Sequence, residues 1–394
     1  MTPTYLAIRG LRAPVQLVGD DWSMYDLDGY FVEGSTAIGT TKTAEPFATL
    51  VAHNGHILFK SDFIDEPVIH TDVVNAMCDL VACTAQQRTV ESTTDMCLHA
   101  AAVQIGNGLT IFPAERRAGK SLLTAAFAAS GHKVFNDDVL PIRSEPGNEM
   151  LGIATGASIR LRLPLPDATP TSVIQHIAEF AGPDNGQYRY LPSPSIATAD
   201  TTAPLKAFVR LTRNDTSRAT FGTMSRGQML RILLRQNFSR EANADHILSA
   251  LVTLATTLPS FELSYSNIDE AQALLDTHLK DLLPTHPVMP EIPPTNPIDL
   301  SFVPDPACRV THSSGAVAKS LDGEIFATSS DMRRILYLDE GATRIWTLLS
   351  EPTSQTEATE IIATAFPDAS KEKIATDTAA IFERLGSLGL ISPA

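Results

Sequence analysis

A short segment of the chain combines residue types that bind phosphate chains. Gly119, Lys120 and Ser121 lie between an apolar run, residues 109–112, and a helix-forming run, residues 122–130. A loop that enters a helix N-terminus presents converging backbone N–H groups and the positive end of the helix dipole to an anion. In this arrangement the lysine would reach the β- and γ-phosphates of a nucleotide, and the serine hydroxyl would ligate Mg²⁺. The sequence therefore predicts a phosphate-binding loop that opens a helix.

The predicted loop departs from the usual pattern at its first position, where Ala114 stands in place of glycine. Alanine carries a Cβ, so its backbone must avoid positive φ, and Pro113 stiffens the entry to the loop. The residues predicted to contact the nucleotide are Ala114, Glu115, Arg116, Arg117, Ala118, Gly119, Lys120, Ser121 and Leu122.

An acidic pair, Asp137 and Asp138, follows the next apolar run and completes the order strand, loop, helix, strand, carboxylate. Neighbouring residues of a strand face opposite ways, so one carboxylate can hold a metal ion while the other faces the attacking nucleophile. Ser121 and Asp138 are the candidate metal ligands, although the residues alone leave the roles of the two aspartates interchangeable. The alternative interpretation is a simple turn after a strand.

Three further side chains could assist the chemistry. His99 belongs to an apolar run, residues 98–105, that ends in a Gly-Asn-Gly hairpin signal, which places it on a strand beside the loop. Taken alone, such a histidine is more often a satisfied core residue. Arg160 and Arg162 alternate with aliphatic residues, so they share one strand face and could clamp phosphate charge. Solvated arginines on an edge strand are the alternative.

This segment resembles the HPr serine kinase/phosphorylases, and especially the HPr-kinase-like enzymes of peptide natural-product clusters, including lasso-peptide kinases. The resemblance is carried by His99-Ala100-Ala101-Ala102-Val103, the Gly106/Gly108 turn, Ala118-Gly119-Lys120-Ser121, Ser130-Gly131-His132 and Asn136-Asp137-Asp138. It implies an α/β P-loop kinase core with a phosphoenolpyruvate-carboxykinase-like site. The motif that HPr kinases use for phosphorolysis and for HPr is not recognisable here, so HPr is not the implied substrate.

The resemblance also implies roles for individual residues. His99 would assist, Lys120 and Ser121 would bind ATP and Mg²⁺, and Asp137 and Asp138 would supply metal ligation and the catalytic base. The choice between ATP and GTP stays open, as does reversal by phosphate attack.

A second module follows a proline-rich stretch, residues 284–297, whose prolines fit neither a helix interior nor a central strand. This composition predicts an extended, semi-rigid linker. Beyond it, short β-type runs at residues 309–321, 324–329 and 334–338 precede three runs with helical periodicity, at residues 342–349, 355–366 and 371–388. Residues 337–349 and 377–390 resemble PqqD-like domains, the peptide-recognition elements of systems that modify ribosomally made peptides. That resemblance implies a winged helix that captures a leader peptide by adding it as a strand to a sheet edge.

The groove implied by this resemblance lies between residues 332–338 and the helix at 377–388. The residues predicted to contact the leader peptide are Arg334, Ile335, Leu336, Tyr337, Leu338, Ile381, Arg384 and Leu385. The alternative is that about half of these are core residues, and Trp346 is expected to be buried packing. This segment has more acidic than basic residues and lacks a basic stripe, which speaks against binding to nucleic acid.

Composition limits the remaining possibilities. A net charge of −15 disfavours nucleic acid and anionic membranes as partners, and no apolar stretch reaches the roughly 18 residues of a membrane-spanning helix. Four cysteines without metal-ligand spacing indicate reduced thiols in the cytoplasm. The predicted domains are a mixed α+β lead-in (1–95), the kinase core (96–283), the linker (284–300) and the PqqD-like domain (301–394).

These features predict a cytoplasmic kinase that uses ATP and Mg²⁺ to phosphorylate a Ser or Thr hydroxyl of a precursor peptide held by the C-terminal module. Two other functions stay open. The chain could be a non-catalytic, nucleotide-binding scaffold that presents a leader peptide, or a kinase for a small metabolite. HPr kinases and their relatives are often oligomers, so a homo-oligomer is compatible with the resemblance, without a fixed number of subunits.

Overall fold

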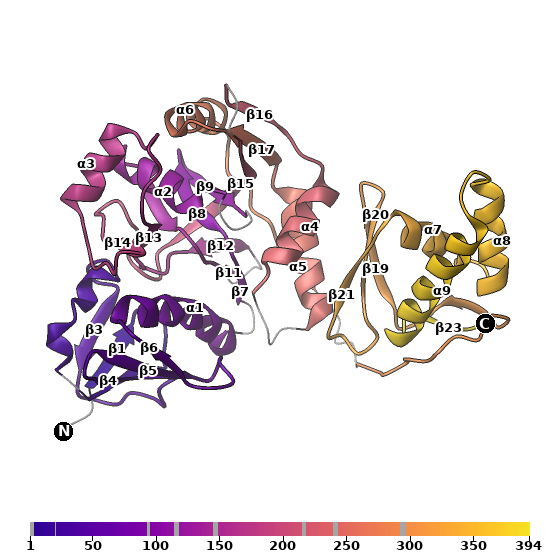
Figure 1. Ribbon diagram of the computed structural model, residues 1–394, viewed down its shortest axis with the longest axis horizontal. Coiled ribbons are helices and arrows are strands. Elements are labelled where there is room, and N and C mark those ends of the chain that lie inside the picture. The colour runs from indigo at the N-terminus through magenta and orange to yellow at the C-terminus, as the bar shows by residue number, and fades with distance from the viewer. Residues whose placement is uncertain are drawn as a thin grey trace. The chain divides into compact units, whose positions relative to one another are not determined.

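The computed structural model describes residues 4–19, 21–92, 95–113, 118–144, 149–214, 218–238, 243–291 and 297–394. The chain divides into two compact units (Figure 1). The first comprises Met1–Met224, Ile232–Glu241 and Leu254–Met289, and the second comprises Ser225–Arg231, Ala242–Thr253 and Pro290–Ala394. The lead-in segment and the predicted kinase core therefore form one unit. The second unit adds the beginnings of α4 (Arg226–Gln236) and α5 (Ala244–Thr257) to the C-terminal segment.

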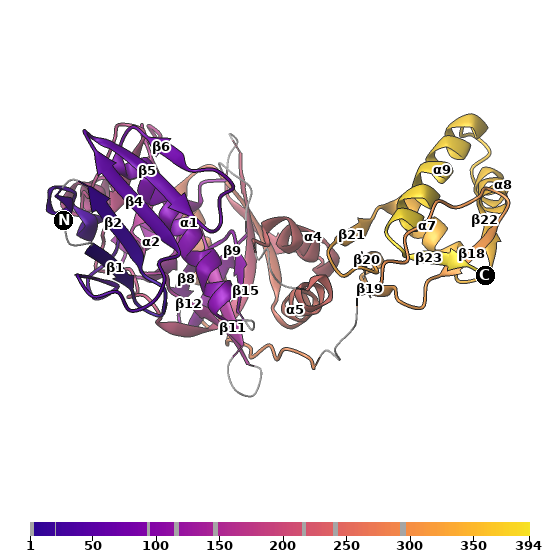
Figure 2. The ribbon, with the colours of Figure 1, turned by 90° about the horizontal axis from the view of Figure 1, so that it is seen from below.

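The lead-in segment folds into a six-stranded sheet of order β3-β1-β2-β4-β5-β6. Its strands are β1 (Thr4–Ile8), β2 (Val15–Gly19), β3 (Thr36–Gly39), β4 (Ala48–His53), β5 (His56–Ser61) and β6 (Val68–His70). Every second residue of β4 is buried, as expected for a strand with one covered face. Helix α1 (Val73–Glu91) packs along β4, β5 and β6 (Figure 2). The lead-in segment therefore contains both strands and a helix, in keeping with the mixed α+β prediction.

The predicted kinase core forms a nine-stranded sheet of order β10-β8-β9-β15-β12-β11-β7, with β17 also pairing with β15 and β16 pairing with β17. Its strands are β7 (Asp95–Leu98), β8 (Ala101–Ile105), β9 (Gly108–Phe112), β10 (Lys133–Asn136), β11 (Leu140–Ser144), β12 (Met150–Ile153), β15 (Thr202–Arg213), β16 (Thr220–Thr223) and β17 (Ser260–Tyr265). The predicted β8–β9 hairpin is confirmed, with Ile105 opposite Gly108.

The predicted strand at residues 98–105 is broken in the structure. Strand β7 pairs with β11 at one end of the sheet order, whereas β8 pairs with β9 and β10 near the other end. One straight strand cannot reach both sets of partners, so the chain leaves the sheet at His99 and Ala100. The prediction that His99 lies on a strand is therefore wrong, because it lies at this break.

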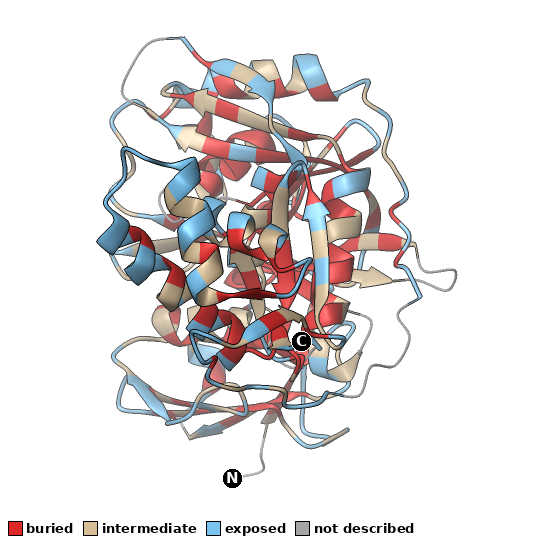
Figure 3. Cartoon of the chain, turned by 90° about the vertical axis from the view of Figure 1, so that its right-hand side faces the viewer, coloured by how far each residue is buried: buried red, intermediate tan, exposed pale blue. Residues whose placement is uncertain are grey.

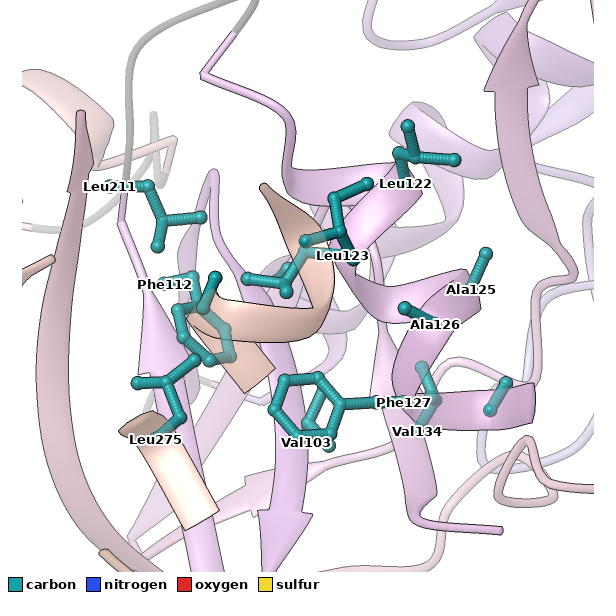
Figure 4. Close-up of a cluster of buried hydrophobic side chains, with 14 of the residues drawn as sticks. Val103, Phe112, Leu122, Leu123, Ala125, Ala126, Phe127, Val134, Leu211 and Leu275 are labelled. Atoms are coloured by element: carbon teal, nitrogen blue, oxygen red, sulfur yellow. The ribbon is translucent and has the colours of Figure 1, made fainter. Parts of the chain in front are cut away.

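Helix α2 (Lys120–Ala129) lies at the centre of the main hydrophobic core (Figure 4). Leu123 and Phe127, one turn apart, pack with Val103 of β8 and Phe112 of β9. The helix also contacts β10, β13 (Ile159–Arg162), α3 (Thr171–Glu179) and α6 (Ile268–Leu279). A second short strand, β14 (Tyr188–Leu191), pairs with β13. Burial on these sides fixes where the N-terminus of α2 points.

The C-terminal segment of the second unit contains two small sheets and three helices within the described residues. Its elements are β18 (Arg309–His312), β19 (Val317–Leu321), β20 (Glu324–Thr328), β21 (Ile335–Leu338), α7 (Glu340–Leu348), β22 (Thr353–Ser354), α8 (Gln355–Ala365), α9 (Lys371–Ser387) and β23 (Ile391–Pro393). The predicted β-run at residues 309–321 is two strands in separate sheets, β22-β18-β23 and β19-β20-β21. Along α9, buried residues recur every three or four positions, with exposed residues between them. Figure 3 shows how far each residue of the chain is buried. Trp346 is buried as expected and stacks on His312, with 4.0 Å between ring centroids.

The predicted linker has two different parts. Residues 292–296 lie outside the described residues. Before them, Pro287 accepts a hydrogen bond from Met150 N at 2.8 Å, and Leu205 O accepts one from Thr285 N at 3.1 Å. The first half of the proline-rich stretch is therefore bound to β12 and β15 and is not a free spacer. Within the described part of the chain, no helix is long and apolar enough to cross a membrane.

Candidate functional site

Helix α2 begins directly after a glycine with a left-handed backbone. Gly119 precedes the helix with φ of 89°, a left-handed conformation that glycine adopts without strain, and its carbonyl accepts the bond from Leu123 N at 3.0 Å. The side chain of Leu122 is buried in the core, so only its backbone could contact a nucleotide. Four predicted nucleotide contacts lie outside the described residues: Ala114, Glu115, Arg116 and Arg117.

Tyr265, at the end of β17, supports this loop through a hydrogen bond. Its hydroxyl donates to Ala118 O at 2.9 Å, and a Cβ at Gly119 would come within 2.4 Å of the same hydroxyl oxygen. Burial raises the pKa of Tyr265 to about 12, so the hydroxyl keeps its proton at neutral pH. Tyr265 was not predicted from the sequence, because it is remote from the loop in the chain and no local motif marks it.

Asp137 is the more buried of the two carboxylates and lies in the bend that follows β10. Its Oδ2 accepts the backbone N–H of Arg160 at 3.0 Å, and its side chain is hydrogen-bonded to Ser121. The preceding residue, Asn136, anchors the bend by donating to Ile153 O at 2.9 Å. Ser121 is therefore partnered with Asp137, whereas the sequence analysis had assigned the metal to Ser121 and Asp138.

Asp138 has a separate set of partners, all cationic or able to become so. His99 Nε2 lies 2.8 Å from its Oδ1, and Arg160 Nη2 donates to its Oδ2 at 3.1 Å. Lys120 Nζ lies 3.5 Å from His99 Nε2. A ring nitrogen that bonds a carboxylate must carry the proton and act as the donor. Lys120 therefore cannot donate a hydrogen bond to His99 Nε2, although the two nitrogens lie close together. The structure thus brings six predicted residues to one place: His99, Lys120, Ser121, Asp137, Asp138 and Arg160.

The environments of the two aspartates drive their pKa values apart. Burial, reinforced by the charge of Asp138, raises the pKa of Asp137 to about 6 despite Arg160 and Ser121. For Asp138 burial acts in the same direction, but the hydrogen bond from His99 and the charges of Arg160, His99 and Lys120 outweigh it and lower its pKa. Asp138 therefore stays ionised under conditions in which Asp137 takes up a proton. A pair of carboxylates with diverging pKa values is typical of sites with two distinct roles.

The backbone of His99 is fixed by a distant segment. Its N–H donates to Gln236 O at 2.7 Å, and Phe238 N donates to Cys97 O at 3.0 Å. The last residue of α4 and the residues after it thus hold the break between β7 and β8 in place. No sequence signal connects Gln236 with His99, and the sequence analysis did not identify this residue.

The two arginines predicted as a phosphate clamp behave differently. Both guanidinium groups lie over the ring of Tyr188, at 5.3 Å for Arg160 and 5.6 Å for Arg162, so they share one face of β13 as predicted. Only Arg160 contacts the acidic pair. Arg162 is exposed and donates to Tyr188 Oη at 3.2 Å. Of the two, Arg160 belongs to the cluster and Arg162 lies at its margin.

The donor atoms at this site fit magnesium that arrives with a nucleotide. Within the described residues, no group of three or more His, Cys, Asp or Glu side chains could hold a metal ion by itself. Ser121 and Asp137 offer a hydroxyl and a carboxylate, which are hard oxygen donors. Mg²⁺ is commonly held by one or two carboxylates together with substrate phosphates and water.

The groove predicted in the second unit is partly formed by core residues. Strand β21 pairs with β20 and, within the described residues, has no strand on its other edge. Of the predicted peptide contacts, Leu336, Leu338 and Leu385 have buried side chains in the hydrophobic core, as the alternative interpretation expected. Arg334 and Arg384 are exposed, and Ile335, Tyr337 and Ile381 are half-buried.

Tyr337 already has a partner within its unit. The guanidinium of Arg231 lies 5.0 Å from the centre of its ring, and Arg231 also pairs with Glu324 at 2.9 Å. The sequence analysis did not identify this contact. A peptide added to β21 would therefore depend mainly on the backbone edge of the strand and on the exposed arginines near it.

Comparison with known families bears on this second unit. Residues 328–391 match the family described as coenzyme PQQ synthesis protein D (PqqD). The C-terminal segment is a PqqD domain. The match covers β21, the three helices and the start of β23, and it leaves the first unit unassigned. The PqqD domain thus includes every residue predicted above to contact a leader peptide.

Two solved structures are similar to parts of the chain. One is TbiB1 in complex with the TbiA(beta) leader peptide, at 21% identity over 21% of this chain and 94% of that chain, with a TM-score of 0.19. The other is the HPr(Ser) kinase/phosphatase from Coxiella burnetii, at 13% identity over 46% of this chain and 91% of that chain, with a TM-score of 0.24. No curated protein matches this chain.

Proposed function

We propose that this chain is an ATP- and Mg²⁺-dependent kinase that phosphorylates a Ser or Thr hydroxyl of a ribosomally made precursor peptide, whose leader the PqqD domain captures. In this proposal the first unit contains a P-loop kinase core of the HPr-kinase type, the PqqD domain is a winged helix, and the reaction takes place in the cytoplasm. The observation that carries the proposal is the meeting of Lys120 and Ser121, at the start of α2, with Asp137 and Asp138.

The proposed reaction transfers the γ-phosphoryl group of ATP to the acceptor hydroxyl. The acceptor oxygen bonds to the γ-phosphorus, the bond to the β–γ bridging oxygen breaks, ADP leaves, and the hydroxyl proton passes to Asp138. Lys120 neutralises charge that develops on the transferred group, and the N-terminus of α2 holds the phosphates through its backbone. A bound Mg²⁺ would be held by Ser121 and Asp137 and would supply further neutralisation of phosphate charge.

The surroundings of the two aspartates favour this division of roles. Asp138 stays ionised because His99 and Arg160 bond its two oxygens, so it is always able to accept the acceptor's hydrogen bond. Its low pKa makes it a weak base. Since phosphoryl transfer passes through a loose transition state, orientation of the hydroxyl matters more than basicity. Asp137 lies beside Ser121 and suits the metal.

The PqqD domain contributes by tethering the substrate. A peptide bound on the same chain reaches the kinase site at an effective concentration far above its concentration in solution. This tethering explains why one chain would carry both modules.

Mass spectrometry tests the proposal directly. The full chain is incubated with ATP, Mg²⁺ and the precursor peptide encoded beside its gene, and we expect the peptide to gain one phosphate, with none added by Lys120→Met. ATP turnover with an unmodified peptide would contradict the peptide substrate and favour a small-metabolite kinase. Equal maturation of the peptide with wild type and Lys120→Met would instead favour a non-catalytic scaffold.

The acid limb of the pH–rate profile should report Asp137. Its folded pKa is raised to about 6, so activity that requires its ionised form should fall as the pH drops through that value. Arg160 lowers the pKa of Asp137, so Arg160→Met should move the acid limb of kcat/KM to higher pH. Arg162→Met is the matched control, because Arg162 shares the strand face without bonding either aspartate. An equal shift in both variants would contradict the assignment.

A further inference from the structure

Three exposed arginines of the second unit form no ion pair with any described residue. Residues 301–394 contain five arginines. Arg309 pairs with Glu357 and Arg344 pairs with Glu340. Arg333, Arg334 and Arg384 are exposed and form no ion pair with any described residue. This segment has more acidic than basic residues, so carboxylates are available to pair with its arginines. Three arginines without an ion pair among the described residues therefore stand out.

Hydrogen bonds place the turn before β21, which contains Arg333 and Arg334, beside the end of α9, which contains Arg384. The turn before the strand is closed by Ser329 N donating to Arg334 O at 2.9 Å. The same turn is bound to the end of α9, because Ser330 N donates to Leu388 O at 3.0 Å. Arg384 precedes Leu388 by four residues, so it lies about one helical turn from this contact. The turn before β21 and the last turn of α9 are therefore neighbours, and we call the region of their three arginines the basic corner.

The acidic residues nearby do not cancel this charge. Asp331 lies in the same turn, where its Oδ1 accepts Ser329 Oγ at 2.5 Å and Arg333 N at 3.1 Å, and these bonds with the arginine charges lower its pKa. Glu383 neighbours Arg384 on α9 but is about 100° away around the helix. The other end of β21 leads into Asp339 and Glu340. The free edge of the strand thus runs from a basic start to an acidic end.

We propose that the edge of β21 takes up an extended peptide segment with two or more Asp or Glu residues at one end, aligned with Arg333, Arg334 and Arg384. The proposal rests on the leader capture proposed above and names the chemical class of the captured segment. Backbone bonds along a strand edge give affinity to almost any sequence, so a charged corner is what can select a partner and set its direction. The acidic end of β21 repels the reverse alignment.

Nucleic acid is the competing partner for a cluster of arginines. Phosphate recognition on a duplex uses a stripe of cations along a helix or groove. Here three arginines occupy one corner of an otherwise acidic module. The geometry therefore favours a short acidic peptide, and a labelled duplex of about 20 base pairs serves as the comparison ligand.

The experiment selects binders from a displayed library of random peptides of about twelve residues, using the full-length chain in the presence of ATP and Mg²⁺. We expect wild type to enrich sequences with clustered Asp and Glu, and Arg333→Glu with Arg334→Glu to enrich Lys and Arg instead. A fluorescent wild-type binder should bind about 10-fold more weakly to the triple glutamine variant of Arg333, Arg334 and Arg384 at ~0.1 M salt. That difference should shrink at ~1 M salt.

Arg344→Gln is the matched control, because Arg344 lies in the same domain, pairs with Glu340 and stacks on Phe366. It should bind the peptide like wild type. Each of four outcomes would overturn the inference: no peptide is selected, the selected peptides lack acidic residues, Arg344→Gln loses as much peptide affinity as the triple variant, or the duplex binds more tightly than the peptide. Phosphorylation of the precursor peptide is measured separately. Selection of acidic peptides without phosphate transfer would contradict the proposed kinase activity alone. Phosphorylation of the precursor without selection of acidic peptides would contradict this inference alone.

Discussion

Asp138→Asn is expected to lower the rate of phosphoryl transfer by roughly 10²- to 10⁴-fold, the usual contribution of a positioned acid or base. Asparagine has the same shape, but only its carbonyl oxygen can accept a hydrogen bond, so it keeps the bond from either His99 or Arg160 and cannot take the proton of the acceptor. ATP affinity should stay equal or increase slightly, because a negative charge is removed beside Lys120. Single-turnover transfer from labelled ATP measures the first quantity, and calorimetry of Mg²⁺–ATP binding measures the second.

Asp137→Asn provides the matched comparison. Asp137 is bonded to Ser121 and to the backbone of Arg160, so its loss should weaken Mg²⁺-dependent ATP binding, whereas Asp138→Asn should not. A rate of phosphoryl transfer by Asp138→Asn within 10-fold of the wild-type rate would show that Asp138 only positions other groups. A large loss of Mg²⁺–ATP affinity in that variant would instead assign Asp138 to the metal.

Gly119→Ala is expected to weaken ATP binding by about 10- to 100-fold. A residue with a Cβ costs about 1–3 kcal/mol in the left-handed conformation that Gly119 adopts. The new methyl group would also meet the hydroxyl of Tyr265 at 2.4 Å, so the loop or the tyrosine must move. Tyr265→Phe alone should lower ATP affinity only a few-fold, because it removes one hydrogen bond to Ala118. Calorimetry with ATP and Mg²⁺ measures both variants.

The double variant separates the two causes. Tyr265→Phe removes the atom that the alanine methyl group would strike, so the double variant should bind ATP more tightly than the two single losses predict. The backbone strain at position 119 would remain. Strict additivity would show that the close contact contributes nothing. ATP affinity of Gly119→Ala equal to that of wild type would remove the argument that this glycine shapes a phosphate site.

Local patterns predicted much of the secondary structure. The Gly-Asn-Gly turn defines the β8–β9 hairpin, and the run after Lys120 forms α2. The three helical runs after position 340 became α7, α8 and α9 within a few residues of their expected ends. These elements follow from hydrophobic periodicity and from turn residues, which depend only on near neighbours in the sequence.

Predictions that depended on distant pairing were less successful. The run at residues 98–105 looks continuous, but its two halves pair with different strands, and the chain breaks at His99. The run at residues 309–321 is likewise divided between two sheets. Strand pairing is decided by partners far away in the sequence, and a single run of apolar residues does not encode them.

By itself, the sequence determined which chemical groups this protein can bring to a phosphate. Lys120, Ser121, Asp137 and Asp138 have the order and spacing from which a strand, a loop and a helix build such a site. Only the tertiary structure decided which groups meet: Ser121 with Asp137, His99 and Arg160 with Asp138, and Tyr265 and Gln236 as supports from remote segments. The physical reason is that burial and neighbouring charges set the properties of each carboxylate, and both arise only when distant strands pack together.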